Sequence, residues 1–284
     1  YHDPGRPLAF SCEKCGLGFR WLAELRDAAH AARPGCSVIG ECWNWPGEWL
    51  HVLDGVLNMF LRQFVLEFAG GATGARPLAR ALERLVAECP IEGLLQSHLV
   101  LDNHDVPRLA TVIPQVERRV LARALQFTIP GSPVVHYGSE LGMTGGADPR
   151  NRAPMRWDLL RDGNPDLEAV RSLAQLRAAN PALRIGDCMV LDSESVLAFL
   201  RTTDRATETI LVAADASDEP ARERVAVRDS RLMDAAKLEC LLTGTHARLE
   251  SGTVLLEVPP RTVQVLRSTD RGEGPGYSAF KRVL

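Results

Sequence analysis

The sequence predicts an α/β fold with parallel strands, followed by an all-β part with antiparallel strands. Between residues 20 and 183, short apolar runs that end on polar residues alternate with segments of helical periodicity. From residue 184 to 268 the apolar residues recur with period two. The first pattern is typical of a (β/α)8 TIM barrel, and the second is typical of an antiparallel β-sandwich.

The elements of the first part follow one another as helix, strand, strand, helices, strand, helix, strand and helix. A helix in "RWLAELRDAAHAARP" places Leu22, Leu25, Ala29 and Ala32 on one apolar face and is stopped by Pro34-Gly35. The segments expected after it are a strand that ends at Glu41, a short strand in "HVLDGVLNM", helices near 59–69 and 76–89, a strand at 98–102, a helix in "QVERRVLARALQFTI", a strand in "GSPVVHYGSELGM" and a helix in "PDLEAVRSLAQLRAANPAL".

The second part contains the runs "CMVLDSESVLAFLRT", "TETILVAADAS" and "GTVLLEVPPRTVQVLRS". Their alternation predicts a sandwich over residues 184–268, followed by a polar, glycine-rich tail at 269–284. The residues expected to face the core of this sandwich are Leu197, Phe199, Ile210, Val212, Leu255 and Val265.

Composition excludes several classes of function. The chain has 284 residues, of which 45% are hydrophobic and 24% charged, and its formal net charge is −3. Neither nucleic acid nor a membrane is therefore an expected partner, because basic residues are scattered and no apolar run reaches the ~18 residues of a membrane span.

The seven cysteines, at positions 12, 15, 36, 42, 89, 188 and 240, are odd in number and widely spread. This distribution favours free thiols, a reducing compartment and hence a cytoplasmic location. Cys12 and Cys15 have the spacing of one half of a zinc site, but no second pair follows them. No metal or other cofactor is expected.

Two of the apolar runs end on ionisable residues. The apolar run in "CSVIGECW" ends on Glu41, and the one in "HLVLDNHDVPRL" ends on Asp102, Asn103, His104 and Asp105. Asn-His-Asp is also ordinary turn chemistry, so the pattern alone leaves a plain turn open. If both runs are parallel strands of a barrel, their carboxyl ends meet at one mouth, and Glu41, His104 and Asp105 are expected to converge there.

Three motifs in this order, "VIGECW", "LVLDNHDVPRLAT" and "PGSPVVHYGSELGMTGGADPRNRAPMRWD", resemble the α-amylase family of glycoside hydrolases. The stretch from Gly142 to Trp157 is most similar to the neopullulanase, cyclomaltodextrinase and maltogenic amylase branch. The resemblance covers roughly residues 20–268 and implies retaining hydrolysis of α-glucosidic bonds in maltooligosaccharides, cyclodextrin or pullulan, or transfer of the same sugars. It implies that Glu41 is the general acid/base, that Asp105 stabilises the transition state and that His104 binds the sugar.

Three further residues are candidates for substrate binding: Asn103, Trp43 and Arg108. Sugars present apolar C–H faces that stack on aromatic rings, so Trp43 at the mouth suits a carbohydrate site, although it could also be a core aromatic. Arg108 could equally be a structural partner of a carboxylate. Asp148, Asn151 and Arg152 are expected to stabilise the loop after the last strand.

The sequence departs from the family in its first part. Only four strands fit between residues 38 and 138, and they match strands five to eight of the family barrel. The strand with the nucleophilic Asp, normally in a "GFRxD" pattern, has no counterpart: "GFRWL" carries Leu22 at that position, and Asp3 has too few residues before it for a strand.

The chain is therefore predicted to be the C-terminal half of such an enzyme, as a cut fragment, an incomplete reading frame or a genuine half-protein. Its expected organisation is a partial catalytic barrel at 1–183, a C-terminal sandwich at 184–268 and the tail. It is expected to be inactive alone and to self-associate through the open edges of the barrel. The alternative is a non-catalytic carbohydrate-binding or scaffold remnant of the same fold.

Overall fold

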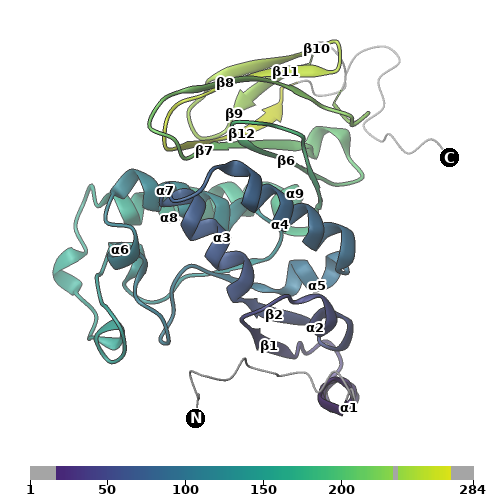
Figure 1. The fold of residues 1–284 in the computed structure, drawn as a ribbon, viewed down its shortest axis with the longest axis vertical. Coiled ribbons are helices and arrows are strands. Elements are labelled where there is room, and N and C mark those ends of the chain that lie inside the picture. Colours follow the sequence, from purple (N-terminus) through teal and green to yellow (C-terminus); the bar gives the residue numbers. More distant parts are fainter. Residues whose placement is uncertain (1–16, 233–235, 270–284) are drawn as a thin grey trace.

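A computed structural model describes residues 17–232 and 236–269, which form a parallel sheet, a layer of helices and an antiparallel sheet (Figure 1). Asp3, Cys12 and Cys15, and the predicted tail from residue 270 onward, lie outside these residues. The five cysteines within them are free thiols. None of the described helices is long and apolar enough to cross a membrane.

The parallel sheet has the strand order β1-β2-β3-β4. Its strands are β1 (Ile39–Cys42), β2 (Gly55–Asn58), β3 (His98–Val100) and β4 (Ser132–Val134). All four predicted strands are confirmed, and all three pairings between neighbours are parallel. The third strand is two residues shorter than predicted, because Asp102 turns to accept a hydrogen bond from the backbone N–H of Leu109.

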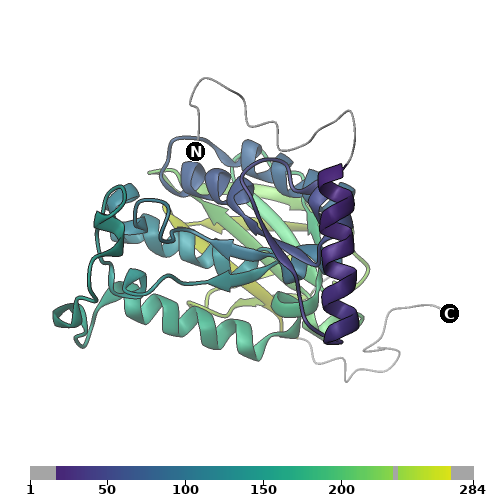
Figure 2. The same cartoon turned by 90° about the horizontal axis from the view of Figure 1, so that it is seen from below.

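Within the described residues, nine helices accompany these strands, and α3, α4, α7, α8 and α9 lie between the two sheets, whereas α1 lies beyond β1 and β2 on the far side from the antiparallel sheet (Figures 1 and 2). They are α1 (Leu17–Ala32), α2 (Gly47–Val52), α3 (Met59–Ala69), α4 (Ala75–Glu88), α5 (Ile91–Gln96), α6 (Leu109–Val112), α7 (Val116–Thr128), α8 (Pro165–Ala179) and α9 (Pro181–Ile185). Short 3-10 turns follow β4 at Ser139–Leu141, Arg150–Arg152 and Trp157–Leu159. The apolar faces of α3, α4 and α7 share one core with the first strands of the antiparallel sheet.

Helix α1 forms as predicted, but its expected inner face is wrong. Leu25 is 56% exposed and Ala32 is also exposed, because α1 packs along α2 rather than on a face of the sheet. Its attachment is partly polar: the His30 ring lies 2.9 Å from the Asp54 carboxylate, which also accepts the backbone N–H of Val38.

The antiparallel sheet has the order β5-β6-β7-β12-β9-β10-β11-β8 and curls into two layers. Its strands are β5 (Asp187–Val190), β6 (Leu197–Thr202), β7 (Ile210–Asp215), β8 (Ala221–Ala226), β9 (Lys237–Cys240), β10 (His246–Glu250), β11 (Thr253–Val258) and β12 (Thr262–Ser268). Strands β6 and β7 are buried along their whole length, because helices cover one face and the second layer of strands covers the other.

The core face predicted for the sandwich is the face that packs on the helices. Phe199, Val212 and Val265 join the helical core, while their strand neighbours, among them Leu200 and Leu211, fill the space between the two layers. The remaining predicted residues, Leu197 and Ile210, also join the helices, and Leu255 is only partly buried. The choice of face was wrong because both sets of alternating residues on β6 and β7 are apolar, so the sequence indicates a strand but not which of its faces packs on the other layer.

A single carboxylate links the two layers at the free edge of the sheet. Glu223 on β8 accepts hydrogen bonds from the hydroxyls of Ser193 and Ser195 and from the N–H groups of Glu194 and Ser195, over 2.6–2.9 Å. Burial alone would raise the pKa of Glu223, but these four bonds outweigh it and lower the pKa to about 2. The loop between β5 and β6 is thereby attached to β8.

Replacing Glu223 with Gln should remove an acid-sensitive part of the stability. The ionised carboxylate stabilises the fold above the unfolded-state pKa of ~4.3, and this stabilisation is lost as the pH falls from ~4.3 towards 2. Glu223→Gln should cost about 1–2 kcal/mol at pH 7 and less at pH 3. Urea unfolding at both pH values measures this, and Glu257→Gln on the exposed face is the control. An equal cost at both pH values would contradict the assignment.

Candidate active site

The predicted site residues lie at the carboxyl edge of the parallel sheet. Glu41 is the third residue of β1 and pairs in register with Leu57 of β2, which pairs with His98 of β3. The chain then continues past the end of β3 to Asp105. Because the strands are parallel, Glu41 and the turn that holds Asp105 are at the same edge, with β2 between their strands and Asp105 further from the sheet.

Glu41 is exposed, and its surroundings favour an open carboxylate. Its Oε1 accepts a hydrogen bond of 2.9 Å from the Trp43 ring N–H. Gly40 precedes it because the chain passes close to two side chains here: a Cβ at this position would lie 2.6 Å from Leu53 and 2.9 Å from the Trp49 ring. The motif Gly-Glu thus combines tight packing behind the strand with an accessible carboxylate in front.

The three tryptophans after Glu41 have different positions. Trp43 is 50% exposed, beside Glu41. Trp45 packs edge-on against Phe60 at 5.4 Å, and Trp49 packs against the ring of Phe19 at 6.1 Å. Trp45 and Trp49 are therefore packing residues, and of the three only Trp43 presents an open ring at the candidate site.

The turn after β3 is held by its own first side chain. Asn103 is 8% exposed, and its Oδ1 accepts hydrogen bonds from the backbone N–H groups of Asp105 and Val106. This is the local turn chemistry that the sequence pattern indicates. It turns His104 and Asp105 outward, and both are exposed.

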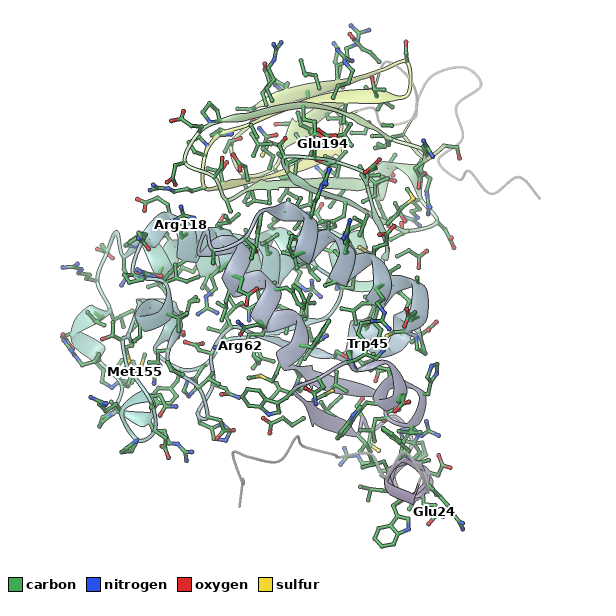
Figure 3. The ribbon with its side chains drawn as sticks, in the orientation of Figure 1. Glu24, Trp45, Arg62, Arg118, Met155 and Glu194 are labelled. Atoms are coloured by element: carbon green, nitrogen blue, oxygen red, sulfur yellow. The ribbon has the colours of Figure 1, made fainter. Side chains whose placement is uncertain are left out.

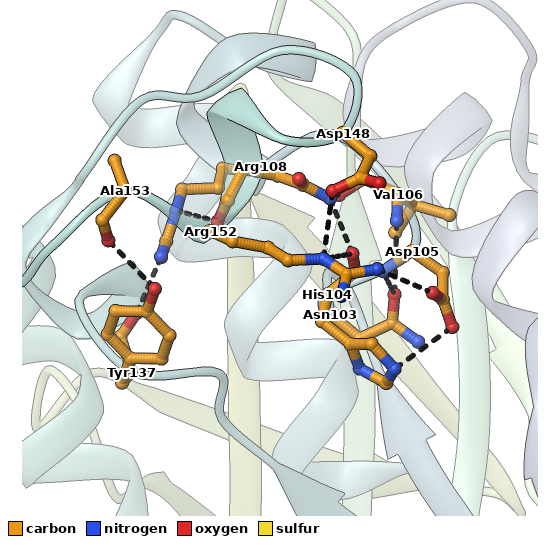
Figure 4. Close-up of polar contacts among 10 residues, drawn as sticks. Asn103, His104, Asp105, Val106, Arg108, Tyr137, Asp148, Arg152 and Ala153 are labelled. Atoms are coloured by element: carbon orange, nitrogen blue, oxygen red, sulfur yellow. Dashed lines mark hydrogen bonds and ion pairs between the residues drawn. The ribbon is translucent and has the colours of Figure 1, made fainter.

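A second segment supports the turn from outside (Figure 4). Asn151 is fully buried and donates to the carbonyl oxygens of His104 and Val106, at 2.8 and 3.1 Å. Arg152 donates to the same His104 oxygen at 3.0 Å. The expectation that Asn151 and Arg152 stabilise a loop holds, but the loop that they contact is the one after β3.

The side chains of the turn form a charged group with Arg152. Asp105 lies 3.3 Å from the His104 ring Nε2 and 3.4 Å from Arg152, which also pairs with Asp148 at 2.9 Å. The side chains of His104 and Asp105 are 62% and 37% exposed, so this group faces solvent. No hydrogen bond or ion pair joins Asp105 to Glu41 within the described residues, and their predicted convergence stays a prediction.

Arg108 differs from the other predicted binding residues. It is fully buried, and its guanidinium donates to the main-chain oxygens of Asn151 and Tyr137 and lies 4.6 Å from the centre of the Tyr137 ring. Tyr137 in turn donates its hydroxyl to the Ala153 oxygen at 2.8 Å. In this conformation Arg108 has no exposed atom with which to contact a substrate, and it joins the loop after β4 to the turn.

Sequence reasoning gave no role to two residues of this region. Asp102 is 1% exposed, and its Oδ2 accepts from the backbone N–H of Leu109 and from the Ser139 hydroxyl, so it ties the loop after β3 to the loop after β4. His136 follows β4 beside Tyr137, with the two rings 4.6 Å apart. The available signal for Asp102 was a carboxylate within an apolar run.

No group of three or more metal-ligating side chains occurs in the described parts of the chain.

Comparison with known proteins agrees with this arrangement. The family model described as alpha amylase, catalytic domain, matches residues 67–199. A cyclomaltodextrinase from Geobacillus thermopakistaniensis (strain MAS1) is 33% identical over 251 residues, which are 86% of this chain and 42% of that protein. The chain is related to the α-amylase family. Neopullulanase 2 from Thermoactinomyces vulgaris is 31% identical over 63% of this chain and 32% of its own length.

Solved structures give the same result for this α-amylase relative. Ttha1563 from Thermus thermophilus superposes with a TM-score of 0.76 at 30% identity, over 87% of this chain and 56% of that chain. A structure named cyclomaltodextrinase gives a TM-score of 0.74 at 27% identity, over 88% of this chain and 43% of that chain. The chain thus spans about two fifths of the Geobacillus protein and of the solved cyclomaltodextrinase.

Proposed function

We propose that this chain supplies the acid/base and the stabilising carboxylate of a retaining α-glucan hydrolase site. The observation that supports this most is that Glu41 and the Asn103–Asp105 turn lie at one edge of a parallel sheet, in a chain related to cyclomaltodextrinases and neopullulanases. The substrates that we infer are maltooligosaccharides, cyclodextrin or pullulan, and the outcome is hydrolysis or transfer of the sugar.

Glu41 is the proton carrier in this proposal. Retaining hydrolysis needs an acid that protonates the leaving glycosidic oxygen and then, as a base, takes a proton from the attacking water. The Trp43 N–H fixes Oε1 of Glu41, which leaves Oε2 open to carry the proton. The exposed Trp43 ring beside it offers a flat apolar face to a sugar.

Asp105 and His104 act on the sugar ring. The transition state resembles an oxocarbenium ion, and a carboxylate near it stabilises the positive charge. Asp105 supplies that charge, and Arg152 and the His104 ring hold its direction at 3.4 and 3.3 Å. His104, the more exposed of the pair, is placed to hydrogen-bond a sugar hydroxyl. We assign Asn103 and Arg108 to positioning of the turn, since both are buried.

We further propose that the parallel part, up to residue 183, is the second half of a (β/α)8 barrel and that residues 184–268 are a separate C-terminal sandwich. Parallel sheets normally have both faces covered. Here helices cover one face. On the row of paired residues Glu41, Leu57 and His98, Glu41 is exposed and the other two are only partly buried. A barrel would enclose that face.

The uncovered edges lead to a prediction about assembly. Strands β1 and β4 each lack a second neighbour in the described sheet, and Val134 and Tyr137 are exposed beside β4. Unpaired strand edges of this kind associate with other chains. Sedimentation velocity on purified chain 1–284 should therefore show species larger than a monomer. A monomer at all concentrations would contradict the open-edge assignment.

The second candidate is a non-catalytic carbohydrate-binding or scaffold protein. The observation that favours it is that the described parallel strands carry one carboxylate, Glu41, whereas retaining chemistry also needs a nucleophile. Asp148, the further carboxylate of the Asp105 group, is already paired with Arg152. Binding without turnover is the result expected of this candidate.

A chimera tests the proposal. The segment of the Geobacillus cyclomaltodextrinase that matches this chain is replaced by the chain itself, so that the relative supplies the remainder of the barrel. Hydrolysis of cyclodextrin should appear, and Glu41→Gln should lower kcat by about 10²–10⁴-fold. Glu48→Gln, at an exposed acidic residue of α2, is the matched control. A folded chimera without turnover, or turnover unaffected by Glu41→Gln, would overturn the assignment.

A further inference from the structure

Several side chains at or near the candidate site have a buried polar atom without a hydrogen-bond partner among the described residues, and four of these atoms are Asp102 Oδ1, Arg123 Nη2, His136 Nδ1 and Glu140 Oε2. They come from the ends of β3 and β4 and from the helix α7 that packs against them. Such atoms are rare in folded proteins, and several together call for one common explanation.

Hydrogen bonds place the four groups in one region. Arg123 Nη1 donates to the side-chain oxygen of Gln126, and Gln126 Nε2 donates to the main-chain oxygens of Leu99 on β3 and Val134 on β4. Asp102, just after β3, accepts the hydroxyl of Ser139, the residue before Glu140.

Burial lowers the pKa of Arg123, and the negative charges of Asp102, Asp166 and Glu140, in that order, oppose that change. Burial likewise lowers the pKa of His136, with Arg108 acting in the same direction and Asp102 against it. These directions agree with the placement that the hydrogen bonds give.

No ion pair joins Arg123 to Asp102 or Glu140 within the described parts of the chain, although the charges are opposite. Arg123 is 2% exposed and directs its Nη1 to the Gln126 side-chain oxygen at 2.8 Å, which leaves Nη2 free. Asp102 is engaged through Oδ2 alone. A buried guanidinium N–H and a buried carboxylate oxygen that both lack a partner are each destabilised, unless a small polar molecule binds them.

We propose that Asp102, Arg123, His136 and Glu140 bind ordered water between the strand ends and α7, and that this hydrated cluster positions the Asn103–Asp105 turn. Water fits because it both donates and accepts hydrogen bonds. The cluster offers one guanidinium donor, two carboxylate acceptors and a His136 ring nitrogen that donates or accepts according to its tautomer. A metal cation fits poorly, since Arg123 already supplies the positive charge and no metal-ligating group of three occurs in the described residues.

The cluster reaches the site through Asp102. Its Oδ2 joins Leu109, after the turn, to Ser139, after β4, while Oδ1 faces the water. Asn103 begins the turn directly after Asp102, so the hydrated carboxylate fixes the starting point of His104 and Asp105. The catalytic consequence rests on the function proposed above, whereas the water site itself does not.

A crystal structure of chain 1–284 at a resolution that locates waters tests the site directly. We expect water within hydrogen-bond distance of both Asp102 Oδ1 and Arg123 Nη2. Direct contact of Arg123 Nη2 with either carboxylate, or a dry gap between them, would overturn the proposal. This result does not depend on any activity, so it can fail or succeed separately from the proposed function.

The positioning role is tested with Asp102→Asn, which keeps the shape and removes one acceptor. In amide NMR spectra of the whole chain, the signals of His104 and Asp105 should shift while those of β7 do not. In the active chimera the same change should lower kcat at least about 10-fold with KM nearly unchanged. Asp162→Asn, at an exposed residue, is the control. Equal behaviour of the two variants would refute positioning. If Asp102→Asn does not fold, Glu140→Gln replaces it with the same readouts.

Discussion

Replacing Arg201 with Met should lower the free energy of unfolding by about 3–5 kcal/mol. Arg201 lies on β6 and is fully buried. Its guanidinium donates to the carbonyl oxygens of Thr128, Leu183 and Gly186, at 2.7, 3.3 and 2.8 Å, and its Nε donates to Asp187 at 3.3 Å. Met fills a similar volume but removes all four bonds, and the three bonds to Thr128, Leu183 and Gly186 are buried.

Two of the acceptors explain why a charged residue is placed here. Thr128 ends α7 and Leu183 lies in the last turn of α9, where carbonyl groups have no partner within the helix and the helix dipole favours a cation. Burial lowers the pKa of Arg201 to about 10, with smaller opposing contributions from Cys188 and Asp187. The group therefore remains charged at neutral pH and joins two helices to the antiparallel sheet.

The measurement is urea unfolding of the two proteins at pH 7, with Arg222→Met as the control. Arg222 on β8 forms an exposed ion pair of 2.9 Å with Glu257, and such a pair contributes under about 1 kcal/mol. A loss for Arg201→Met no larger than for the control would show that the four carbonyl groups find other donors.

Other arginines link the same layers by similar contacts. Arg118 of α7 donates to the oxygens of Ala69 and Ala216 and pairs with Asp218 at 2.7 Å (Figure 3). Arg177 of α8 makes similar contacts within the helical layer, since it donates to the oxygens of Phe127 in α7 and Gly131 before β4. The helices thus contact the antiparallel sheet through apolar packing and through guanidinium groups. These groups donate hydrogen bonds to main-chain oxygens near the ends of the helices.

These contacts separate what was predictable from what was not. Strand β6 was predictable from the short apolar run in "VLAFLRT", because that signal is local. The burial of Arg201 was not, since its partner Thr128 is 73 residues away in the sequence and both faces of β6 are covered. The same cause led to the wrong core face for Phe199 and Val212.

The candidate site divides in the same way. Glu41 and Asp105 were identifiable because carboxylates follow apolar runs, and the Asn103 turn follows from the side-chain chemistry of Asn. Asn151 was assigned to a loop without its partner, because its hydrogen bond to His104 spans 47 residues. Arg108 was ambiguous from sequence, and only its full burial decides between a partner of the main chain and a ligand of the sugar.

Chain 1–284 alone should hydrolyse cyclodextrin, pullulan or a chromogenic maltoside at least about 10³-fold more slowly than the chimera described above. Retaining chemistry forms a covalent glycosyl-enzyme intermediate, which requires a nucleophilic carboxylate besides the acid/base and the stabiliser. In the proposed function Glu41 and Asp105 take these two roles, and the described strands β2, β3 and β4 carry no carboxylate. Asp102 is buried and bonded through Oδ2, so it does not face a sugar.

The assay is run on purified chain with Glu41→Gln and Glu48→Gln beside it. Turnover at the rate of the chimera that disappears in Glu41→Gln and persists in Glu48→Gln would show that a nucleophile exists within the chain, and Asp3, outside the described residues, would be the first to substitute. Turnover that survives Glu41→Gln would instead refute the acid/base assignment. Binding of the substrates without turnover, weakened by Trp43→Ala, is the result expected if the site retains its sugar-facing surface while the nucleophile comes from elsewhere.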